Sequence, residues 1–522
     1  MKYIILFAGI LLYLTTNAQQ WSWAKNVLNS YSPYPQNVAV NGVGKVFTST
    51  VYESNSSYSY NIKTAAYSAS GQLLWNKNIG TPYNSYAYSK ELVADNTNLY
   101  LLGFFVHSIS FANTTISSSS WQLFIACYDQ NGTEKWIKAL PLFSDQGNAV
   151  TIDNNNDLIL TNFSSSPSNG LTVKKISSSG NDIWTKTFST DALPFSITND
   201  SQNHIYISGS NGAGPLSFDG TVYFNDTTHN ENGFIAKLTD IGDIEQVEGI
   251  PGGRIRHIKT DANDNLFISG TYYENGMTVR QTTVPAISPC SNPGYCSSSF
   301  FAKLQGDSCA WIKTTRRSDN NNFAVSPNGN SYVCGWALSD TSASSMAKIT
   351  QFNTSGVVQW HKESEGTYMA SANSVDIAAS GNQDIYLTGA YQSNQYYLNT
   401  KVWFGPDTLP YTGYTTNSFL AKLNDAQIVT GHGFESESGL NPLSVYPNPA
   451  SKMCHITYSS GGVENLHLQM HDVLGNVIYN ESVKAHSGDF HYTLDMSNFA
   501  KGIYLIGIYS ANNKSVQKVV VE

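Results

Sequence analysis

A short pattern recurs along this chain: a tryptophan, one further residue and a lysine. It occurs at six places, Trp23–Lys25, Trp75–Lys77, Trp136–Lys138, Trp184–Lys186, Trp311–Lys313 and Trp360–Lys362. Four of the five intervals between them are 48 to 61 residues, and the fifth, from Trp184 to Trp311, is about twice as long. Periods of roughly 20 to 70 residues are typical of repeat architectures. Such a period means that one small structural unit is stacked many times, so this pattern constrains the fold more than any other feature of the sequence.

Three further segments recur between successive tryptophans, and each occurs seven times. The first is an apolar run followed by an Asp/Asn/Gly turn, as in ELVADNTN, and the second is an alternating run that often carries glycine, as in IYISGS. The third resembles FIAKL at 234–238, where the Phe, Ala and Leu side chains share one face, which is the period of a strand. A glycine stands four residues before a tryptophan at Gly71, Gly132, Gly180 and Gly356. The repeat therefore predicts a unit of four antiparallel strands, with a turn before the fourth.

The tryptophan strand supplies the count of units. A degenerate copy at Ile244–Val247 raises the number of these strands from six to seven. No tryptophan strand follows the last third-type strand at Phe419–Leu423, whereas Trp21–Lys25 has no unit of its own. We therefore predict an all-β, seven-bladed β-propeller over residues 19–430, whose last blade is closed by the N-terminal strand. Such closure leaves only short, protected strand edges.

An open β-sandwich array with accidental similarity among its strands is the alternative to a propeller. Four strand types that recur seven times in a fixed order argue against it. The units resemble the short β-propeller repeats of the bacterial SBBP type, over residues 21 to about 430. This resemblance implies the same radial fold.

The N-terminus has the pattern of a secretory signal peptide at residues 1–18. Lys2 precedes an apolar stretch over residues 3–14 that is too short to span a bilayer, and the small residue Ala18 stands at its end. An N-terminal membrane anchor is the alternative, but no basic flank follows the apolar stretch. No other segment approaches eighteen apolar residues, so we expect no transmembrane helix in the mature chain. The formal net charge of −9 makes nucleic acid an unexpected partner.

The six cysteines are too few for a disulfide scaffold. Cys290 and Cys296 bracket a loop rich in Pro and Gly, and in an exported protein they are the favoured candidates for a small disulfide ring. Cys309 and Cys334 could pair with each other or with that loop. Two more, Cys127 and Cys454, lie inside strand patterns and are expected to be buried as small apolar residues. A zinc site is the alternative for the cluster, but no CxxC pair occurs.

A different strand pattern begins at residue 443, where the propeller period stops. Residues 431–442 are polar and contain glycine, so we expect a linker there. Seven short strand-like runs over residues 443–522 predict a small β-sandwich. Its motifs are YPNP at Tyr446–Pro449, MHDVLG at Met470–Gly475, LDMS at Leu494–Ser497, KGIYL at Lys501–Leu505 and KVVV at Lys518–Val521.

In their order and position these motifs resemble the C-terminal sorting domain of type IX secretion cargo. The motif residues are Pro447, Asn448, Pro449, Asp472, Gly475, Gly502 and Tyr504. The resemblance implies partners in the type IX secretion machinery and its sortase, removal of this domain, and a product that is released or attached to surface lipopolysaccharide. It also implies a bacterium of the Bacteroidetes type and a secreted or outer-membrane surface location. An immunoglobulin-like ligand-binding module is the alternative.

Neither a cofactor nor a metal is predicted. The segment DQNGTEKW at Asp129–Trp136 resembles the tryptophan-docking repeat of quinoprotein dehydrogenases, but the chain lacks the adjacent cysteines of those enzymes. The Gly-to-Trp spacing is instead explained by an aromatic side chain packed between neighbouring sheets. Asp153–Asp157 and Asp261–Asn265 have oxygen ligands at alternate positions, as calcium loops do. The bidentate acid of such a loop is missing, because Ser164 and Tyr272 stand at its positions, so we interpret both segments as turns.

No local motif indicates catalysis, since HExxH and GxSxG are absent and the acids are scattered. Tyrosines are frequent between the strands, at Tyr31, Tyr34, Tyr83, Tyr86, Tyr88, Tyr391, Tyr396, Tyr397, Tyr411 and Tyr414. Exposed tyrosine beside Asn and Ser suits recognition of glycans or proteins, although tyrosine also packs half-buried on β surfaces. We therefore predict a non-catalytic ligand-binding or adhesion propeller. The alternative is an extracellular glycan-active hydrolase or lyase at the channel mouth, which inward carboxylates or histidines there would favour.

Overall fold

The computed structural model divides the chain into two compact units, 1–427 and 428–522, which are described separately. It describes residues 20–521 apart from 29–33, 55–58, 83, 141–146, 165–168, 274, 287–296, 316–321, 339–344, 368–369, 382–383, 393–400, 410–415, 425–442, 461–463, 473–476, 486–487, 498 and 510–513. These described residues form strands and turns, with no helix among them. The protein is therefore an all-β protein.

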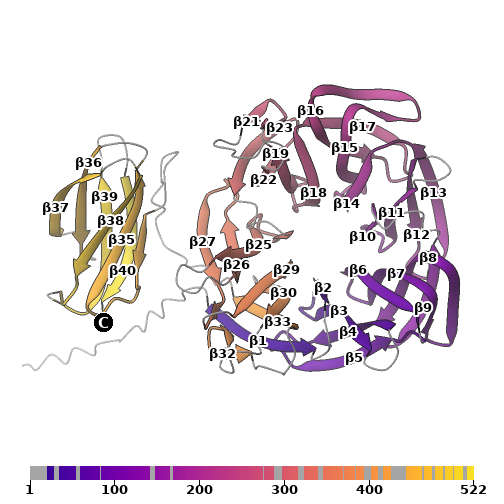
Figure 1. The fold of residues 1–522 in the computed structure, drawn as a ribbon, viewed down its shortest axis with the longest axis horizontal. Coiled ribbons are helices and arrows are strands. Elements are labelled where there is room, and N and C mark those ends of the chain that lie inside the picture. Colours follow the sequence, from indigo (N-terminus) through magenta and orange to yellow (C-terminus); the bar gives the residue numbers. More distant parts are fainter. Residues whose placement is uncertain are drawn as a thin grey trace, which may run out of the picture. The chain divides into compact units, whose positions relative to one another are not determined.

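The first unit is built of sheets whose strands mostly pair antiparallel in chain order (Figure 1). Two sets of four lie in one larger sheet: β2 (Tyr34–Val40), β3 (Val46–Ser54), β4 (Ser59–Tyr67) and β5 (Leu73–Ile79), then β6 (Tyr86–Ala94), β7 (Asn98–Phe111), β8 (Thr114–Asp129) and β9 (Glu134–Leu140). A single parallel pairing, Tyr60 with Tyr86, joins these two sets.

The sheets that follow repeat the same order. One holds β10 (Ala149–Ile152), β11 (Leu158–Ser164), β12 (Gly170–Ile176) and β13 (Asp182–Ser189), and the next β14 (Leu193–Asn199), β15 (Ile205–Phe218), β16 (Thr221–Leu238) and β17 (Ile244–Pro251). Then come β18 (Gly253–Thr260), β19 (Leu266–Tyr273), β22 (Ser297–Gln305) and β23 (Ser308–Thr315), followed by β24 (Asn322–Val325), β25 (Ser331–Leu338), β26 (Ser345–Phe352) and β27 (Val358–Glu363).

One sheet of this unit combines strands from both ends of the chain. It is ordered β1 (Gln20–Leu28), β33 (Thr416–Asn424), β30 (Asp384–Gln392) and β29 (Ser371–Ala379). In the antiparallel pairing of β1 with β33, Trp23 lies opposite Lys422 and Ala24 opposite Ala421. The N-terminal strand thus occupies the fourth position of this sheet.

The first strands of the sheets contact one another in series around an axis. The contacts run β2 to β6, β6 to β10, β10 to β14, β14 to β18, β18 to β24, β24 to β29, and β29 back to β2. Figure 1 shows these strands innermost, with the other strands of each sheet further out. The arrangement is propeller-like. Its apolar core lies between neighbouring sheets, as where Leu102 and Ile125 cluster with Val150 and Leu160.

The repeated tryptophans connect each sheet to the next. The Trp75 ring packs against Gly132, which lies at φ 82° in the turn before the fourth strand of the following sheet. Its Nε1 donates to the carbonyl oxygen of Gln130 at 3.1 Å. Four more pairs share this contact and bond: Trp23 with Gly71, Trp136 with Gly180, Trp184 with Gly242 and Trp311 with Gly356. Ring packing and a satisfied indole N–H explain why Trp and Gly recur together.

Short hairpins cover the gaps between neighbouring sheets on the outside. Phe111, at the tip between β7 and β8, packs edge-on against Tyr128 at 4.8 Å. The hairpin of β20 (Met277–Val279) and β21 (Thr282–Val284) is buried against the sheet of β18. In the sheet of β28 (Glu365–Gly366), β31 (Val402–Phe404) and β32 (Asp407–Leu409), Phe404 packs edge-on against Trp21.

The second unit contains two sheets around one apolar core. One orders β34 (Ser444–Tyr446), β35 (Met453–Ser460) and β38 (Gly488–Asp495), and the other β37 (Val477–Ala485), β36 (Glu464–His471), β39 (Gly502–Tyr509) and β40 (Lys514–Val521). Ile456 from the first sheet clusters with Leu468 and Ile506 from the second. Alternating inward side chains from both sheets make this unit a small β-sandwich.

The Gly132→Ala substitution tests the contact between tryptophan and glycine. An alanine Cβ would lie 2.6 Å from Cδ2 of Trp75, and alanine would also be strained at φ 82°. Gly306→Ala is the matched control, because Gly306 has φ 52° before a fourth strand but nothing within 4 Å of its added Cβ. We expect the Gly132 variant to lose about 1–3 kcal/mol more free energy of unfolding than the control, in urea melts. Equal losses would show that the backbone, rather than the indole, requires glycine there.

Candidate ligand-binding site

Five innermost strands carry a β-bulge at the same register. The extra residue is Lys90 in β6, Phe195 in β14, Arg256 in β18 and Val375 in β29, and β2 shifts register between Pro35 and Asn37. A bulge inserts one unpaired residue and redirects the side chains around it. We call Lys90, Phe195, Arg256 and Val375 the bulge residues.

Glycine in the second strand accommodates four of these bulges, whereas Thr50 of β3 stands beside the bulge of β2. A Cβ on Gly209 would lie 1.9 Å from the carbonyl oxygen of Leu193, and one on Gly270 would lie 1.9 Å from that of Arg254. Gly103 and Gly389 are crowded in the same way by carbonyl oxygens of β6 and β29. The glycine of the repeated alternating segment is therefore the sequence signal of the bulge, since an isolated glycine in a strand marks a close backbone approach.

The residue after the bulge binds the next sheet. Asp376 Oδ2 accepts a hydrogen bond from the Val38 backbone N–H at 2.8 Å, and Glu91 Oε2 accepts one from that of Val150 at 2.9 Å. Ser196 accepts from the backbone of β18 in the same way, at 3.2 Å. The backbone N–H groups on the inner edge have no further strand to pair with, so these side chains satisfy them. We call them the edge-capping residues.

Two of the edge-capping residues are acids with shifted titration. Burial raises the pKa of Glu91 to about 7, although the Val150 N–H and the charges of Lys90 and Lys259 favour its ionised form. Burial likewise raises the pKa of Asp376, against the charge of Lys259. The charge of Lys259 on β18 favours the ionised form of both acids, although they lie on two other sheets.

An aromatic cluster lies where the first two sets of strands meet. The Tyr60 ring stacks on that of Tyr88 at 5.3 Å and lies 5.7 Å from that of Tyr86. Trp121 of β8 lies 5.7 Å from Tyr88 and is 43% exposed. Tyr60 and Tyr86 are brought together by the one parallel pairing between β4 and β6. We call Tyr60, Tyr86, Tyr88 and Trp121 the aromatic platform.

The tyrosines expected at a binding surface have different outcomes. Tyr86 and Tyr88 are half-buried within the platform. Tyr391 lies on β30 rather than between strands, and it is 1% exposed. Its ring lies in the core, and its hydroxyl accepts a hydrogen bond from Asn26 Nδ2 at 2.6 Å. The side chains of Tyr31, Tyr34, Tyr83, Tyr396, Tyr397, Tyr411 and Tyr414 lie outside the described residues. Sequence reasoning missed Tyr60 and Trp121, since only the fold brings them beside β6.

The two segments with spaced Asp and Asn side chains are turns. Asp153 Oδ1 accepts hydrogen bonds from the backbone N–H groups of Asn155 and Asp157, at 2.8 and 2.9 Å. Its Oδ2 lies 2.6 Å from Nζ of Lys175. In the second segment Asp261 binds the N–H groups of its own turn and faces the Lys303 ammonium at 3.4 Å. A lysine thus supplies the positive charge at each turn.

Four cysteines are described, each with a free thiol: Cys127, Cys309, Cys334 and Cys454. Cys127 and Cys454 are fully buried, as expected for small apolar residues. The pairing considered for Cys309 with Cys334 is not formed, because Cys334 lies inside a core cluster while Cys309 lies on β23. Cys290 and Cys296 lie outside the described residues, so their disulfide stays a prediction.

Most of the described sorting-motif residues lie beside or between the strands of the sandwich, and Tyr504 lies within β39. Asn448 connects the YPNP motif to β40, because its Nδ2 donates to the Lys518 carbonyl oxygen at 2.8 Å and its Oδ1 accepts from the Val520 N–H at 2.9 Å. The Tyr504 hydroxyl donates to the Ala500 carbonyl oxygen at 2.6 Å, and Gly502 begins β39. Pro447 and Pro449 flank Asn448, Asp472 follows β36, and Gly475 lies outside the described residues.

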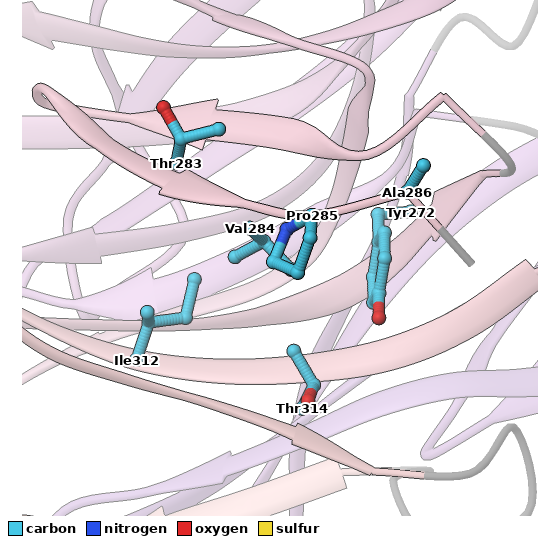
Figure 2. Close-up of a pocket in the computed structure, with 7 residues that line it drawn as sticks. All are labelled: Tyr272, Thr283, Val284, Pro285, Ala286, Ile312 and Thr314. Carbon is cyan, nitrogen blue, oxygen red and sulfur yellow. The ribbon is translucent and has the colours of Figure 1, made fainter. Parts of the chain in front are cut away.

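A shallow pocket of about 440 Å³ lies on the outer part of the sheet of β18. Figure 2 shows it under the β20–β21 hairpin, between Tyr272 of β19, Ile312 and Thr314 of β23, and residues 283–286. Its lining holds apolar and hydroxyl groups but no carboxylate, imidazole or cation.

Residues 444–522 match the family model described as the secretion system C-terminal sorting domain. This domain marks proteins that the type IX secretion system exports to the cell surface or the extracellular space, so this protein is exported by that route. None of the described residues forms a helix with the length and apolarity of a membrane span. No curated protein matches the chain.

Among solved structures, the chain is similar to an ulvan lyase of a new polysaccharide lyase family, at 11% identity over 75% of this chain and 98% of that chain, with a TM-score of 0.43. It is similar to the β-propeller domain of the Trilobed protease from Pyrococcus furiosus, at 8% identity over 74% and 97% of the chains, with a TM-score of 0.40. A protein of unknown function from Bacteroides caccae is 11% identical over 58% and 89%, with a TM-score of 0.32. Scores this low carry no argument about activity.

Glu91→Gln tests the charge at the inner edge. The pKa of Glu91 is about 7 in the folded chain against an ordinary 4.5, so ionisation opposes folding. The contribution of Glu91 to the free energy of unfolding therefore falls as pH rises from about 4.5 to 7, by at most about 3 kcal/mol. Glutamine can still accept from the Val150 N–H without this charge. We expect the variant to be more stable than wild type at pH 8 but not at pH 4.5, in urea melts.

Asp376 remains in this variant and its raised pKa acts in the same direction. The informative quantity is therefore the difference between the wild-type and variant curves, rather than the slope of either. Parallel curves from pH 4.5 to 8 would contradict the assignment of an uncompensated buried charge to Glu91.

Proposed function

We propose that residues 19–430 form a seven-bladed β-propeller closed by the N-terminal strand, and that this propeller is a non-catalytic glycan-binding or adhesion module. The aromatic platform carries the functional part of this proposal. The pairing of β1 with β33 and the serial contacts of the inner strands support the closed ring.

The platform has the chemistry of a sugar-binding surface. Its four aromatic rings touch in succession, with centroids 5.3 to 6.5 Å apart, and the terminal Trp121 is exposed. Sugar rings present apolar C–H faces that pack on aromatic rings, while phenol and indole groups remain able to hydrogen-bond at the wet edge. Tyr and Trp also lose little conformational entropy on binding. Repeated rings therefore suit several sugars of one chain.

The route to the cell surface forms the second part of the proposal. Residues 1–18 act as a signal peptide, residues 431–442 link the domains, and residues 443–522 are recognised by the type IX machinery and its sortase. Pro447, Asn448, Pro449, Asp472, Gly475, Gly502 and Tyr504 belong to that recognised fold. The product is released or joined to surface lipopolysaccharide, in a bacterium of the Bacteroidetes type.

A glycan-active hydrolase or lyase is the second candidate, and one observation favours it. Glu91 and Asp376 are two inward acids with raised pKa, and Glu91 would be partly protonated near neutral pH, as a general acid requires. Their hydrogen bonds to the backbone of the next sheet favour a structural role instead. Shortened glycan chains after long incubation with wild type, but not with Glu91→Gln, would establish the enzyme.

Tyr88→Ala and Trp121→Ala test the platform on a glycan array. We expect each variant to bind the glycans recognised by wild type at least about tenfold more weakly, because a stacked aromatic contributes about 1–3 kcal/mol to such contacts. Tyr223→Ala is the control, since Tyr223 is 40% exposed but lies on β16 outside the platform. A wild-type protein that binds no glycan, or variants that bind like wild type, would refute the assignment.

Deleting Trp21–Lys25 tests the closure of the ring. Trp21 and Trp23 are 2% and 7% exposed, and removing a buried aromatic side chain costs about 3–5 kcal/mol. We expect the deletion to lower the melting temperature of the whole propeller, or to prevent its folding, relative to a chain that lacks only residues 1–18. If the two chains melt alike, the ring does not depend on its N-terminal strand.

A further inference from the structure

At three of the four bulges, the bulge residue is more exposed than the residue that follows it. Lys90 and Arg256 are exposed, and Val375 is 37% exposed. Asp376, directly after Val375, is buried at 9% exposure and bonds to the next sheet. In β6, β18 and β29 the insertion of one residue thus places an exposed side chain beside a more buried one.

The two charged bulge residues, Lys90 and Arg256, are both positive, although the whole chain carries a formal net charge of −9. Lys90 makes no ion pair or side-chain hydrogen bond with any described residue. Its neighbour Glu91 accepts a backbone N–H and has a pKa raised by burial, which reduces its negative charge near neutral pH. Two arginines lie on β18. Arg254 forms an ion pair with Glu231, whereas Arg256 is the residue inserted at the bulge.

Aromatic rings stand beside both cations. Lys90 follows Tyr88 by two residues on β6, which places it next to the aromatic platform. The Arg256 guanidinium lies 5.9 Å from the centroid of Phe195, the bulge residue of the preceding sheet. A cation over a ring face is held in place without losing its capacity to bind an anion. An aromatic ring thus lies near each cation, through the chain at Lys90 and through a cation–ring contact at Arg256.

We infer that the glycan bound at the platform is anionic, and that Lys90 and Arg256 bind its carboxylate or sulfate groups. This inference rests on the proposed glycan-binding function and narrows it to one class of ligand. Each sugar ring packs on an aromatic side chain while its acidic substituent meets a cation at the bulge. Hydrogen bonds between charged partners contribute more than neutral ones, so the cations would select acidic over neutral chains.

The test compares three polymers with the intact exported chain by isothermal titration calorimetry. The charged groups of polygalacturonate are carboxylates, those of dextran sulfate are sulfates, and dextran is neutral. The variant is Lys90→Gln combined with Arg256→Gln. The matched control is Lys25→Gln combined with Lys77→Gln, which removes the same charge from exposed lysines of β1 and β5 on the outer wall. We expect the variant to bind one or both acidic polymers about 10- to 100-fold more weakly, with the control close to wild type.

The outcomes separate this inference from the function on which it rests. Binding of polygalacturonate alone or of dextran sulfate alone identifies the acidic group, and loss of that binding in the variant supports the inference. Equal losses of affinity in variant and control would overturn the inference of an anionic ligand, and so would acidic polymers that bind no better than dextran. In either case, an affinity for dextran that depends on Tyr88 would still support the glycan-binding function. A chain that binds none of the three polymers and no arrayed glycan would overturn both.

Discussion

The inner edge of each sheet presents the constraint on which the rest of the first unit depends. An innermost strand has no partner on the axial side, so its backbone N–H groups need hydrogen bonds from elsewhere. Asp376 and Glu91 supply them to Val38 and Val150 across the junctions between sheets. These two side chains therefore satisfy backbone N–H groups of an inner edge and also connect their own sheet to the neighbouring one. Without them the axial region would contain unpaired polar backbone.

The bulge makes this capping and a ligand surface compatible. In an unbulged strand, successive side chains alternate between two faces, so a capping residue would leave its neighbour facing the opposite sheet. The extra residue breaks the alternation, and Lys90 can face solvent while Glu91 faces β10. The bulge also restricts the second strand. A Cβ on Gly103 would lie 2.4 Å from the carbonyl oxygen of Tyr88, so no side chain larger than hydrogen fits at that position. Structure and recognition thus depend on the same inserted residue.

The strands and their order could be predicted from the sequence because Trp-x-Lys occurs six times and three further strand patterns recur between the tryptophans. The contact of Trp75 with Gly132 in the next sheet follows the expected packing of an aromatic between neighbouring sheets. Glu91 and Asp376 each directly precede an apolar run in the sequence. A single polar residue, however, has no periodic signal that distinguishes a capping residue from a surface residue. Tyr391 shows the limit of composition, since its strand carries it into the core. Trp121 joins the platform only through the fold of β8.

The acids and the cations near the axis differ in how firmly hydrogen bonds hold their side chains, and this difference favours ligand binding over catalysis. A general acid must release and regain its proton while holding the substrate geometry. Glu91 and Asp376 each hold a backbone N–H of the neighbouring sheet, so a change in either charge is coupled to the stability of a junction. Lys90 forms no such bond to a neighbouring sheet among the described residues, so its ammonium group can move to contact a ligand. A site whose acids hold the scaffold and whose cations face solvent is better suited to retaining an acidic chain than to cleaving one.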